Sequence, residues 1–264
     1  MISMHTQIFP RLEVFFLEEW IEHHTTLGVE KFYIYDTGLV SIDNKKRRQP
    51  GRKLNKDEVG VKWSKKPDVN YFLEYSDDEI YQKLHQVIDK FNGNVELIPW
   101  AVGKECIKDC RYKCQVHGYR HCVKNNKSDW WIHMDPDEYI LPLVHTNLRD
   151  FLHEYHNQKG YGSLELQQRV FDSRKKDIPV RSICTWGYET QLRKCIAKTP
   201  TLMMPRNVHM IHSKQGGPHI VERSVMRFNH YRGHPSTSGD AHHIRFKNRK
   251  FDKVDFDMVR FTSK

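Results

Sequence analysis

The sequence lacks any stretch long and apolar enough to cross a membrane. No segment approaches the roughly 20 apolar residues of a spanning helix, and residues 1–10 hold no apolar core of a signal peptide. Internal repeats and low-complexity tracts are also missing, which argues against solenoids and disordered arrays. These absences favour a cytoplasmic protein without a membrane span.

Cysteine is present without the spacing of a structural zinc site. None of the six cysteines forms a Cys-x-x-Cys pair. Cys106, Cys110, Cys114 and Cys122 instead follow one face of an expected helix. Cysteines four apart on a helix rarely form disulfides, so we expect reduced thiols.

Acidic residues are too few to balance the basic ones. The chain has 43 Lys and Arg against 33 Asp and Glu, and its net charge is +10. Such an excess favours anionic partners, namely nucleic acid, phosphorylated small molecules or an acidic membrane surface. Part of it falls in residues 41–70, where Pro and Gly break the periodicity. We expect a basic surface loop there, and a loop that grips phosphates or an acidic glycan is the alternative.

Helical and strand patterns alternate over the first half of the chain. Apolar spacing predicts a helix over residues 14–27 that Gly28 ends. Further helices are expected over 76–91, 103–124 and 147–155, and strands over 29–36, 94–100 and 130–142. The remainder is rich in strand and loop patterns. This order predicts an α/β fold.

Three carboxylates lie close together after the apolar run Trp130–Ile132. Asp135, Asp137 and Glu138 would repel one another unless a cation relieved the repulsion. Oxygen ligands of this kind suit Mg²⁺ or Mn²⁺, which enzymes hold with one or two carboxylates and substrate phosphates. The alternative is an acidic turn that is solvated and binds no metal. We favour the metal site, because the cluster lies within an apolar run.

Late histidines and basic residues are candidates for the rest of such a site. His209 and His212 are three apart, so in a strand they face opposite sides, and one of them could point at the metal. The C-terminal basic residues could clamp a diphosphate, although most of them are expected to be solvated. They are Arg223, Arg227, Arg232, Arg245, Lys247, Arg249 and Lys250.

Residues 11–38 resemble the opening of the family 92 glycosyltransferases. The matching residues are Glu13, Leu17, Glu19, Trp20, Ile21, His24, Leu27, Gly28, Val29, Tyr35 and Asp36. The resemblance continues in order through Gln115 and Cys122, and through segments 130–142, 194–200, 207–212 and 228–233. It covers most of the chain.

The resemblance implies a GT-A fold, which is a Rossmann-like mixed sheet flanked by helices, as one domain over residues 1–264. Residues 1–142 would form the nucleotide-sugar-binding half and residues 143–264 the acceptor-side half. The family implies a hexosyl- or pentosyltransferase that uses a UDP-sugar and Mn²⁺ or Mg²⁺ and acts on a glycan acceptor with inversion.

Site residues follow from the same resemblance. Asp135 and Asp137 would bind the metal and the diphosphate, with His212 as the preferred third ligand and His230 as the alternative. Glu138 would support them or face the acceptor. The donor-binding residues would be Pro10, Arg11, Glu13, Tyr35, Asp36, Gln115, Asp135, Pro136, Asp137 and His230.

The chain departs from the family pattern at two places. Leu12 stands where the family has Asn, and Phe171-Asp172-Ser173 replaces a glycine-serine stretch. Inversion requires a carboxylate base. Asp172 is the first candidate and Glu189 the second, and either could instead be an ion-pair partner.

Two other kinds of protein remain as alternatives. One is a basic nucleic-acid-binding protein, and the other is a zinc-stabilised interaction protein built on the Cys/His helix. The aromatic residues lie in apolar runs rather than among the basic residues, so we expect no nucleic-acid partner.

Overall fold

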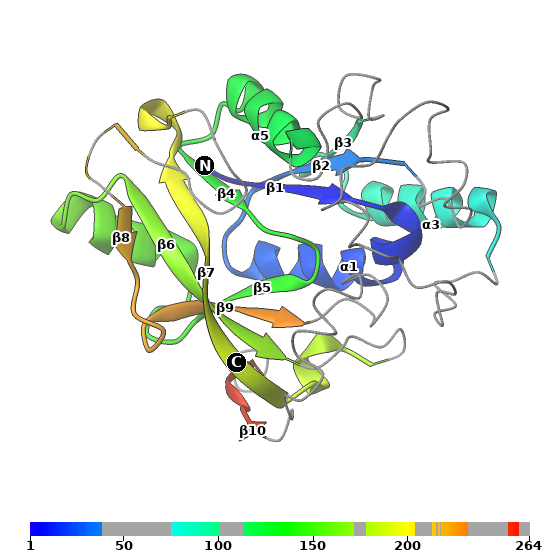
Figure 1. Ribbon diagram of the computed structural model, residues 1–264. Coiled ribbons are helices and arrows are strands. Elements are labelled where there is room, and N and C mark those ends of the chain that lie inside the picture. Colours follow the sequence, from blue (N-terminus) through cyan, green and yellow to red (C-terminus); the bar gives the residue numbers. More distant parts are fainter. Residues whose placement is uncertain are drawn as a thin grey trace, which may run out of the picture.

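The computed structural model describes residues 1–38, 75–100, 113–171, 178–203, 213–214, 216, 218–231 and 253–258. The described residues form one mixed sheet with helices on both of its faces (Figure 1). The mixed α/β fold class is therefore confirmed. The expected basic loop over residues 41–70 lies outside the described residues, and the division into two functional halves stays a prediction.

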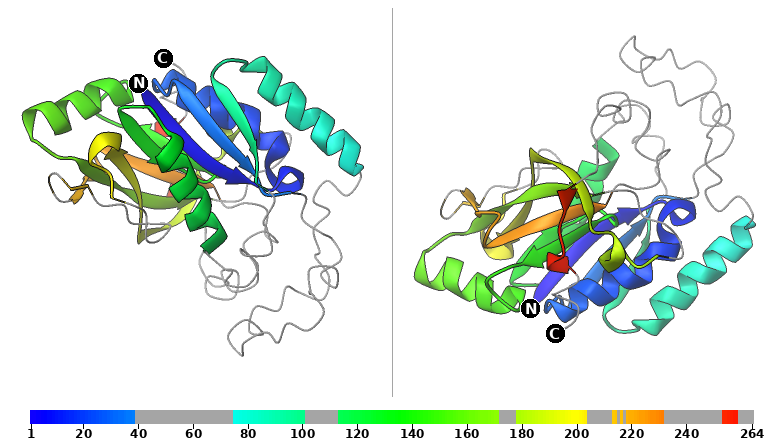
Figure 2. Two further views of the ribbon diagram at one scale, coloured as in Figure 1. Left: turned by 90° about the horizontal axis from the view of Figure 1, so that it is seen from above. Right: turned by 90° about the horizontal axis from the view of Figure 1, so that it is seen from below.

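The first half of the chain builds a parallel part of the sheet. It contains β1 (Ile2–Ile8), β2 (Lys31–Asp36), β3 (Val95–Pro99) and β4 (Trp130–His133), in the order β3-β2-β1-β4. Helices α1 (Pro10–Thr26) and α3 (Asp77–Lys90) pack against each other on one face, and α5 (Lys113–Asn125) covers the other face (Figure 2). The order of the strands reverses at β1, so the chain continues on the other side of this strand when it reaches β4.

The second half extends the sheet with mainly antiparallel strands. The path runs from β4 through β7 (Thr185–Lys198), β6 (Ser163–Phe171) and β9 (Met226–Tyr231) to β5 (Glu138–Pro142). Short strands β8 (Pro218–Ile220) and β10 (Lys253–Val254) pair with β6 and β7. The short helices are α6 (Leu148–Leu152), η1 (His153–Gln158), η2 (Val180–Ser182) and η3 (Thr199–Thr201).

Local sequence signals explain where the helices begin and end. Ser76 caps α3 in a capping box with Glu79, and the Asn147 side chain accepts a hydrogen bond from the backbone N–H of Asp150 at the start of α6. Gly28 follows α1 with a φ of +95°, a conformation that favours glycine. These boundaries agree with the sequence predictions to within a few residues, although the described part of the third helix begins only at Lys113.

Two strand predictions were incomplete. Residues 130–142 form not one strand but two, β4 and β5, which lie at different positions in the sheet. β1 had not been predicted, because its sequence, Ile-Ser-Met-His-Thr-Gln-Ile, is half polar. Three of its polar side chains, Ser3, His5 and Thr6, are nevertheless buried, and the Ser3 hydroxyl contacts that of Ser128 at 2.7 Å.

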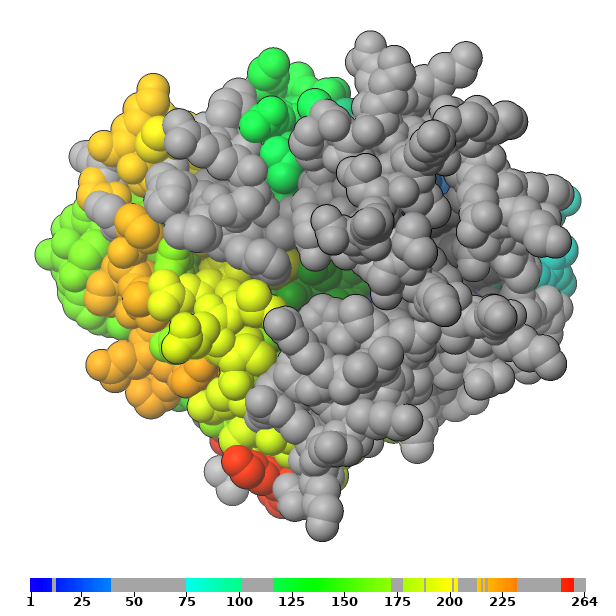
Figure 3. All heavy atoms as spheres, in the orientation of Figure 1, coloured from blue at the N-terminus to red at the C-terminus, as the bar shows by residue number. Residues whose placement is uncertain are grey.

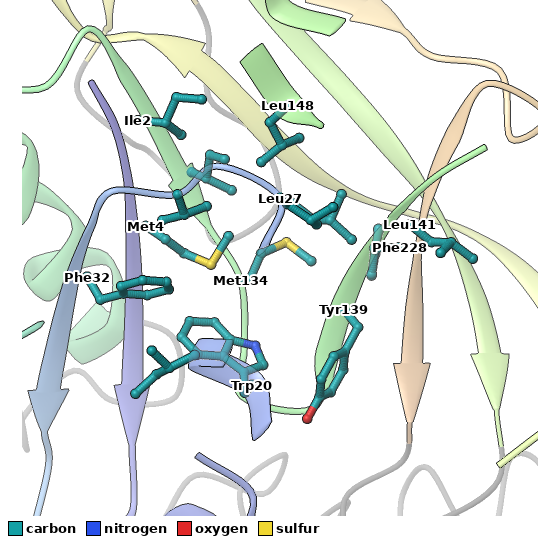
Figure 4. Close-up of a cluster of buried hydrophobic side chains, with 14 of the residues drawn as sticks. Ile2, Met4, Trp20, Leu27, Phe32, Met134, Tyr139, Leu141, Leu148 and Phe228 are labelled. Carbon is teal, nitrogen blue, oxygen red and sulfur yellow. The ribbon is translucent and has the colours of Figure 1, made fainter. Parts of the chain in front are cut away.

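The core lies between α1 and the sheet. Trp20 of α1 is fully buried and lies between the β1 side and Tyr139 of β5, with Met134 beside it (Figure 4). The indole N–H of Trp20 donates a hydrogen bond to the carbonyl oxygen of Glu138 at 2.9 Å. The core therefore fixes the start of β5, where the acidic turn of residues 135–138 ends.

Candidate functional site

The acidic turn lies where the ends of parallel strands meet. Ile8 is opposite Asp36 in the register of β1 and β2, and His5 is opposite His133 in that of β1 and β4. The carboxyl ends of these three strands therefore share one edge, at the point where the strand order reverses. Open α/β sheets bind ligands at such a point. The chain leaves β4 here and curves across to β5 (Figure 1).

The ammonium group of Lys194 joins two carboxylates of the turn. Its Nζ lies 2.6 Å from Oδ2 of Asp135 and 2.8 Å from Oε2 of Glu138. The side chain of Lys194 is only 3% exposed and that of Glu138 only 4%. Oε2 of Glu138 also accepts the backbone N–H of Asp135 at 2.9 Å. An internal cation thus relieves the repulsion that the sequence pattern implied.

A chain of hydrogen bonds leads to the other carboxylate of the turn. Thr190 donates its hydroxyl to Oε1 of Gln168 at 2.6 Å, and the Gln168 amide nitrogen lies 2.5 Å from Nδ1 of His230. Nε2 of His230 lies 3.1 Å from Oδ2 of Asp137. With the amide donating to Nδ1, the proton of neutral His230 is on Nε2 and points at Asp137. This chain orients both the histidine and the carboxylate.

A buried histidine pair lies behind Asp135. Nδ1 of His5 and Nδ1 of His133 are 3.0 Å apart, and Nε2 of His133 lies 3.3 Å from Oδ1 of Asp135. The hydroxyl of Tyr119 also bonds to Nε2 of His133. Burial lowers the pKa of His5 well below its ordinary value, so this ring is neutral.

The pKa values of the turn reflect burial and its cations. Burial raises the pKa of Glu138 to about 7, although Lys194 opposes the shift. Burial also disfavours ionisation of Asp135, but Lys194 and His133 outweigh it and hold the pKa of Asp135 well below the usual range. For His230, burial opposes protonation, but Asp137 raises its pKa above the ordinary value.

Several expected donor-binding residues lie at this edge of the sheet. Pro10 is buried and begins α1, and Oε2 of Glu13 accepts the backbone N–H of Phe9 at 2.8 Å. Asp36 ends β2, and its Oδ1 accepts the backbone N–H of Gly38 at 2.8 Å. Pro136 is buried in the turn itself.

Tyr35 is more deeply buried than a stacking platform would be. Its ring is fully buried on the α5 side of the sheet, and its hydroxyl lies 2.8 Å from Nδ1 of His121. The ring packs edge-on against His5 and Trp100. Contact between Tyr35 and a nucleoside stays a prediction.

Of the two candidate bases, Glu189 lies within the described residues and Asp172 does not. Oε1 of Glu189 lies 2.8 Å from Arg169, and Oε2 lies 3.1 Å from Arg223. Both oxygens of Glu189 are therefore paired with guanidinium groups. Asp172 and His212 lie outside the described residues, as do the side chains of Arg11 and Gln115.

Sequence reasoning had missed the residues that support the turn. Lys194 and Gln168 had not been singled out, and His133 and His5 had not been assigned a role. A usable signal existed for His133, because it is a lone polar residue in a strongly apolar strand run, whereas Lys194 follows Arg193 in a mixed polar strand. Such a residue needs a buried partner. The sequence does not say which partner.

Asp135 and Asp137 are suited to a divalent cation that is completed by phosphate oxygens. Their side chains are 33% and 22% exposed, and both supply hard oxygen ligands from a single turn. In the described ranges, no three His, Cys, Asp or Glu side chains are grouped as a metal site. A metal here would therefore need ligands from a substrate or from other parts of the chain.

The family model for glycosyltransferase family 92 matches residues 60–261. The chain belongs to glycosyltransferase family 92. A rice protein (Oryza sativa subsp. japonica) described as a glycosyltransferase family 92 protein is 24% identical over 242 residues. The match covers 87% of this chain but only 33% of the rice protein. This family 92 chain therefore spans about a third of that relative.

Solved structures give weaker likenesses. HddC from Yersinia pseudotuberculosis aligns with 86% of this chain and 92% of its own, at 9% identity and a TM-score of 0.38. Staphylococcus aureus TarS aligns with 99% of this chain and 42% of its own, at 8% identity and a TM-score of 0.41. Across the described part of the family 92 chain, no helix is long and apolar enough to cross a bilayer.

Proposed function

We propose that this family 92 chain transfers a sugar from a UDP-sugar to a glycan acceptor, with Asp135 and Asp137 holding Mn²⁺ or Mg²⁺. The observation that carries the proposal is the position of the acidic turn at the shared carboxyl ends of β1, β2 and β4. This is the crevice in which open α/β sheets bind nucleotides. Membership of the family supports glycosyl transfer as the activity.

The residues of the turn would bind and orient the donor diphosphate. Asp137 is oriented by His230, and Asp135 by Lys194 and His133. A divalent cation bound to these carboxylates would neutralise the diphosphate leaving group. Fixed carboxylates spare the site the cost of reorganisation during the reaction. The third metal ligand stays open between His212 and His230; in this arrangement His230 already contacts Asp137.

The acceptor side needs a base that takes the proton of the attacking hydroxyl if transfer proceeds with inversion. Glu189 has both carboxylate oxygens against guanidinium groups, so one would have to be released before Glu189 accepted a proton. This favours Asp172, which directly follows the last residue of β6. The space-filling view shows a hollow beside the yellow-green atoms of β7, with green atoms deep within it (Figure 3).

Binding and transfer assays with Asp137→Asn test the proposal. UDP with Mn²⁺ should raise the melting temperature of the wild type, and a panel of UDP-sugars should identify the donor. We expect Asp137→Asn to lose the shift and to slow transfer by about 100-fold or more. Asp89→Asn, an exposed aspartate of α3, is the matched control and should behave as the wild type. The proposal is wrong if no nucleotide sugar binds the wild type.

A further inference from the structure

Lys194 reaches the acidic turn because β7 continues past the end of β4. The antiparallel register pairs Ile132 of β4 with Ile196 of β7. Lys194 precedes Ile196 by two residues, and because the strands are antiparallel it lies beyond this pair, beside the turn that follows β4. Its ammonium group is buried and contacts Asp135 and Glu138 at 2.6 and 2.8 Å.

Glu138 connects this lysine to the backbone of the turn. Its Oε2 accepts both the ammonium group and the N–H of Asp135, and the Glu138 N–H donates to the carbonyl oxygen of Asp135 at 3.0 Å. A buried carboxylate is stable in such a place only if a cation and hydrogen bonds satisfy it. Lys194 thus holds the carboxylate that closes the turn.

The same ammonium group would oppose a divalent cation on Asp135. Oδ2 of Asp135 is already bound to Lys194, and two positive charges a few ångströms apart repel strongly in a partly buried site. A nucleoside diphosphate adds negative charge and oxygen ligands to the metal. The diphosphate can therefore offset the repulsion between Lys194 and the divalent cation, which the carboxylates of the turn cannot offset by themselves.

We propose that Lys194 is a resident counter-cation that keeps the turn closed without a metal and makes the loading of a divalent cation depend on a nucleoside diphosphate. This inference rests on the proposed function, because it takes Asp135 and Asp137 as the metal ligands. Lys194 acts here as a positioning residue. Its predicted effect is on the affinity for the metal, which can be measured independently of turnover.

Mn²⁺ binding, followed by the electron paramagnetic resonance of free Mn²⁺, tests the inference without an activity assay. The full chain is titrated with Mn²⁺, with and without UDP. We expect the wild type to bind Mn²⁺ weakly alone and much more tightly with UDP. In the absence of UDP, Lys194→Met should bind Mn²⁺ at least about tenfold more tightly than the wild type. UDP should then enhance Mn²⁺ binding less in this variant than in the wild type.

Two further variants keep the test decisive. Lys198→Met removes the same charge from the same strand, at a side chain that contacts His156, and should bind Mn²⁺ as the wild type does. Lys194→Met/Glu138→Gln removes one positive and one negative charge, and the Gln oxygen can still accept the N–H of Asp135. This double variant serves if Lys194→Met does not fold, and it too should bind Mn²⁺ more tightly than the wild type.

The outcomes separate this inference from the proposed function. If the wild type binds Mn²⁺ with UDP but removal of Lys194 leaves the affinity for Mn²⁺ alone unchanged or weaker, only the role of Lys194 is overturned. If the wild type fails to bind Mn²⁺ even with UDP, the metal site of the proposed function fails, and the role of Lys194 fails with it.

Discussion

Two adjacent histidines of α1 cover the outer edge of β5. His23 places Nε2 at 2.7 Å from the carbonyl oxygen of Ile140, and His24 accepts the N–H of Ile140 on its own Nε2 at 3.3 Å. Nδ1 of His24 donates to the carbonyl oxygen of Trp20 at 2.9 Å. The backbone N–H and C=O groups of Ile140, which have no neighbouring strand to pair with among the described residues, are thereby bonded to side chains. Neither ring needs a positive charge for these contacts.

Burial makes both histidines hard to protonate in the folded protein. It lowers the pKa of His23 to about 4, and that of His24 lies well below the ordinary value because of burial and the neighbouring His23. In the unfolded chain a histidine titrates near pH 6.5. The unfolded state therefore binds a proton that the folded state does not bind between these two pH values.

The free energy of unfolding should fall as the pH drops from 6.5 toward 4. Above pH 6.5 both states are neutral, and below pH 4 both are protonated, so the loss is confined to this window. With a folded pKa of about 4, His23 alone accounts for about 2 kcal/mol at pH 5 and about 3 kcal/mol at pH 4. His24 should add to this loss.

The assay is urea unfolding of the wild type and His23→Gln at pH 7.5 and pH 5. A glutamine amide can donate to the same carbonyl oxygen but does not titrate. We expect the variant to lose about 2 kcal/mol less than the wild type between the two pH values. His85→Gln, on the exposed face of α3, is the control for the substitution itself. The reasoning is refuted if the stability difference between the wild type and His23→Gln does not change with pH.

The remaining predictions concern the support of the turn and the base. Gln168→Leu leaves the Nδ1 of His230 and the Thr190 hydroxyl without their shared partner, and we expect urea denaturation to show a loss of about 1–3 kcal/mol. Gln82→Leu, at an exposed position of α3, should change stability little, and equal losses in the two variants would contradict the hydrogen-bond chain. If Asp172 is the base, Asp172→Asn should slow transfer by about 10²- to 10⁴-fold at unchanged donor affinity. Glu189→Gln should instead lower the melting temperature, and the opposite pattern would make Glu189 the base.

The sequence determined the elements that depend on local signals. The helix before Gly28, the helix that Ser76 caps, and the strands around residues 31–36 and 95–99 follow from periodicity and from capping residues a few positions apart. The acidic turn was also readable, because three carboxylates after an apolar run stand out in any fold. Family membership followed from ordered motifs over most of the chain, and the family model confirms it over residues 60–261.

The tertiary structure alone decided what surrounds that turn. Lys194 is 56 residues from Glu138 in the sequence, and His5 is 128 residues from His133, yet each pair is in contact. Such contacts depend on strand order and register, which place β7 and β1 on either side of β4. No local pattern encodes which distant strand lies beside another, because that choice is made by the packing of the whole core. The carboxylates of the turn could therefore be predicted from the sequence alone, whereas the cation and histidines that contact them depend on the fold.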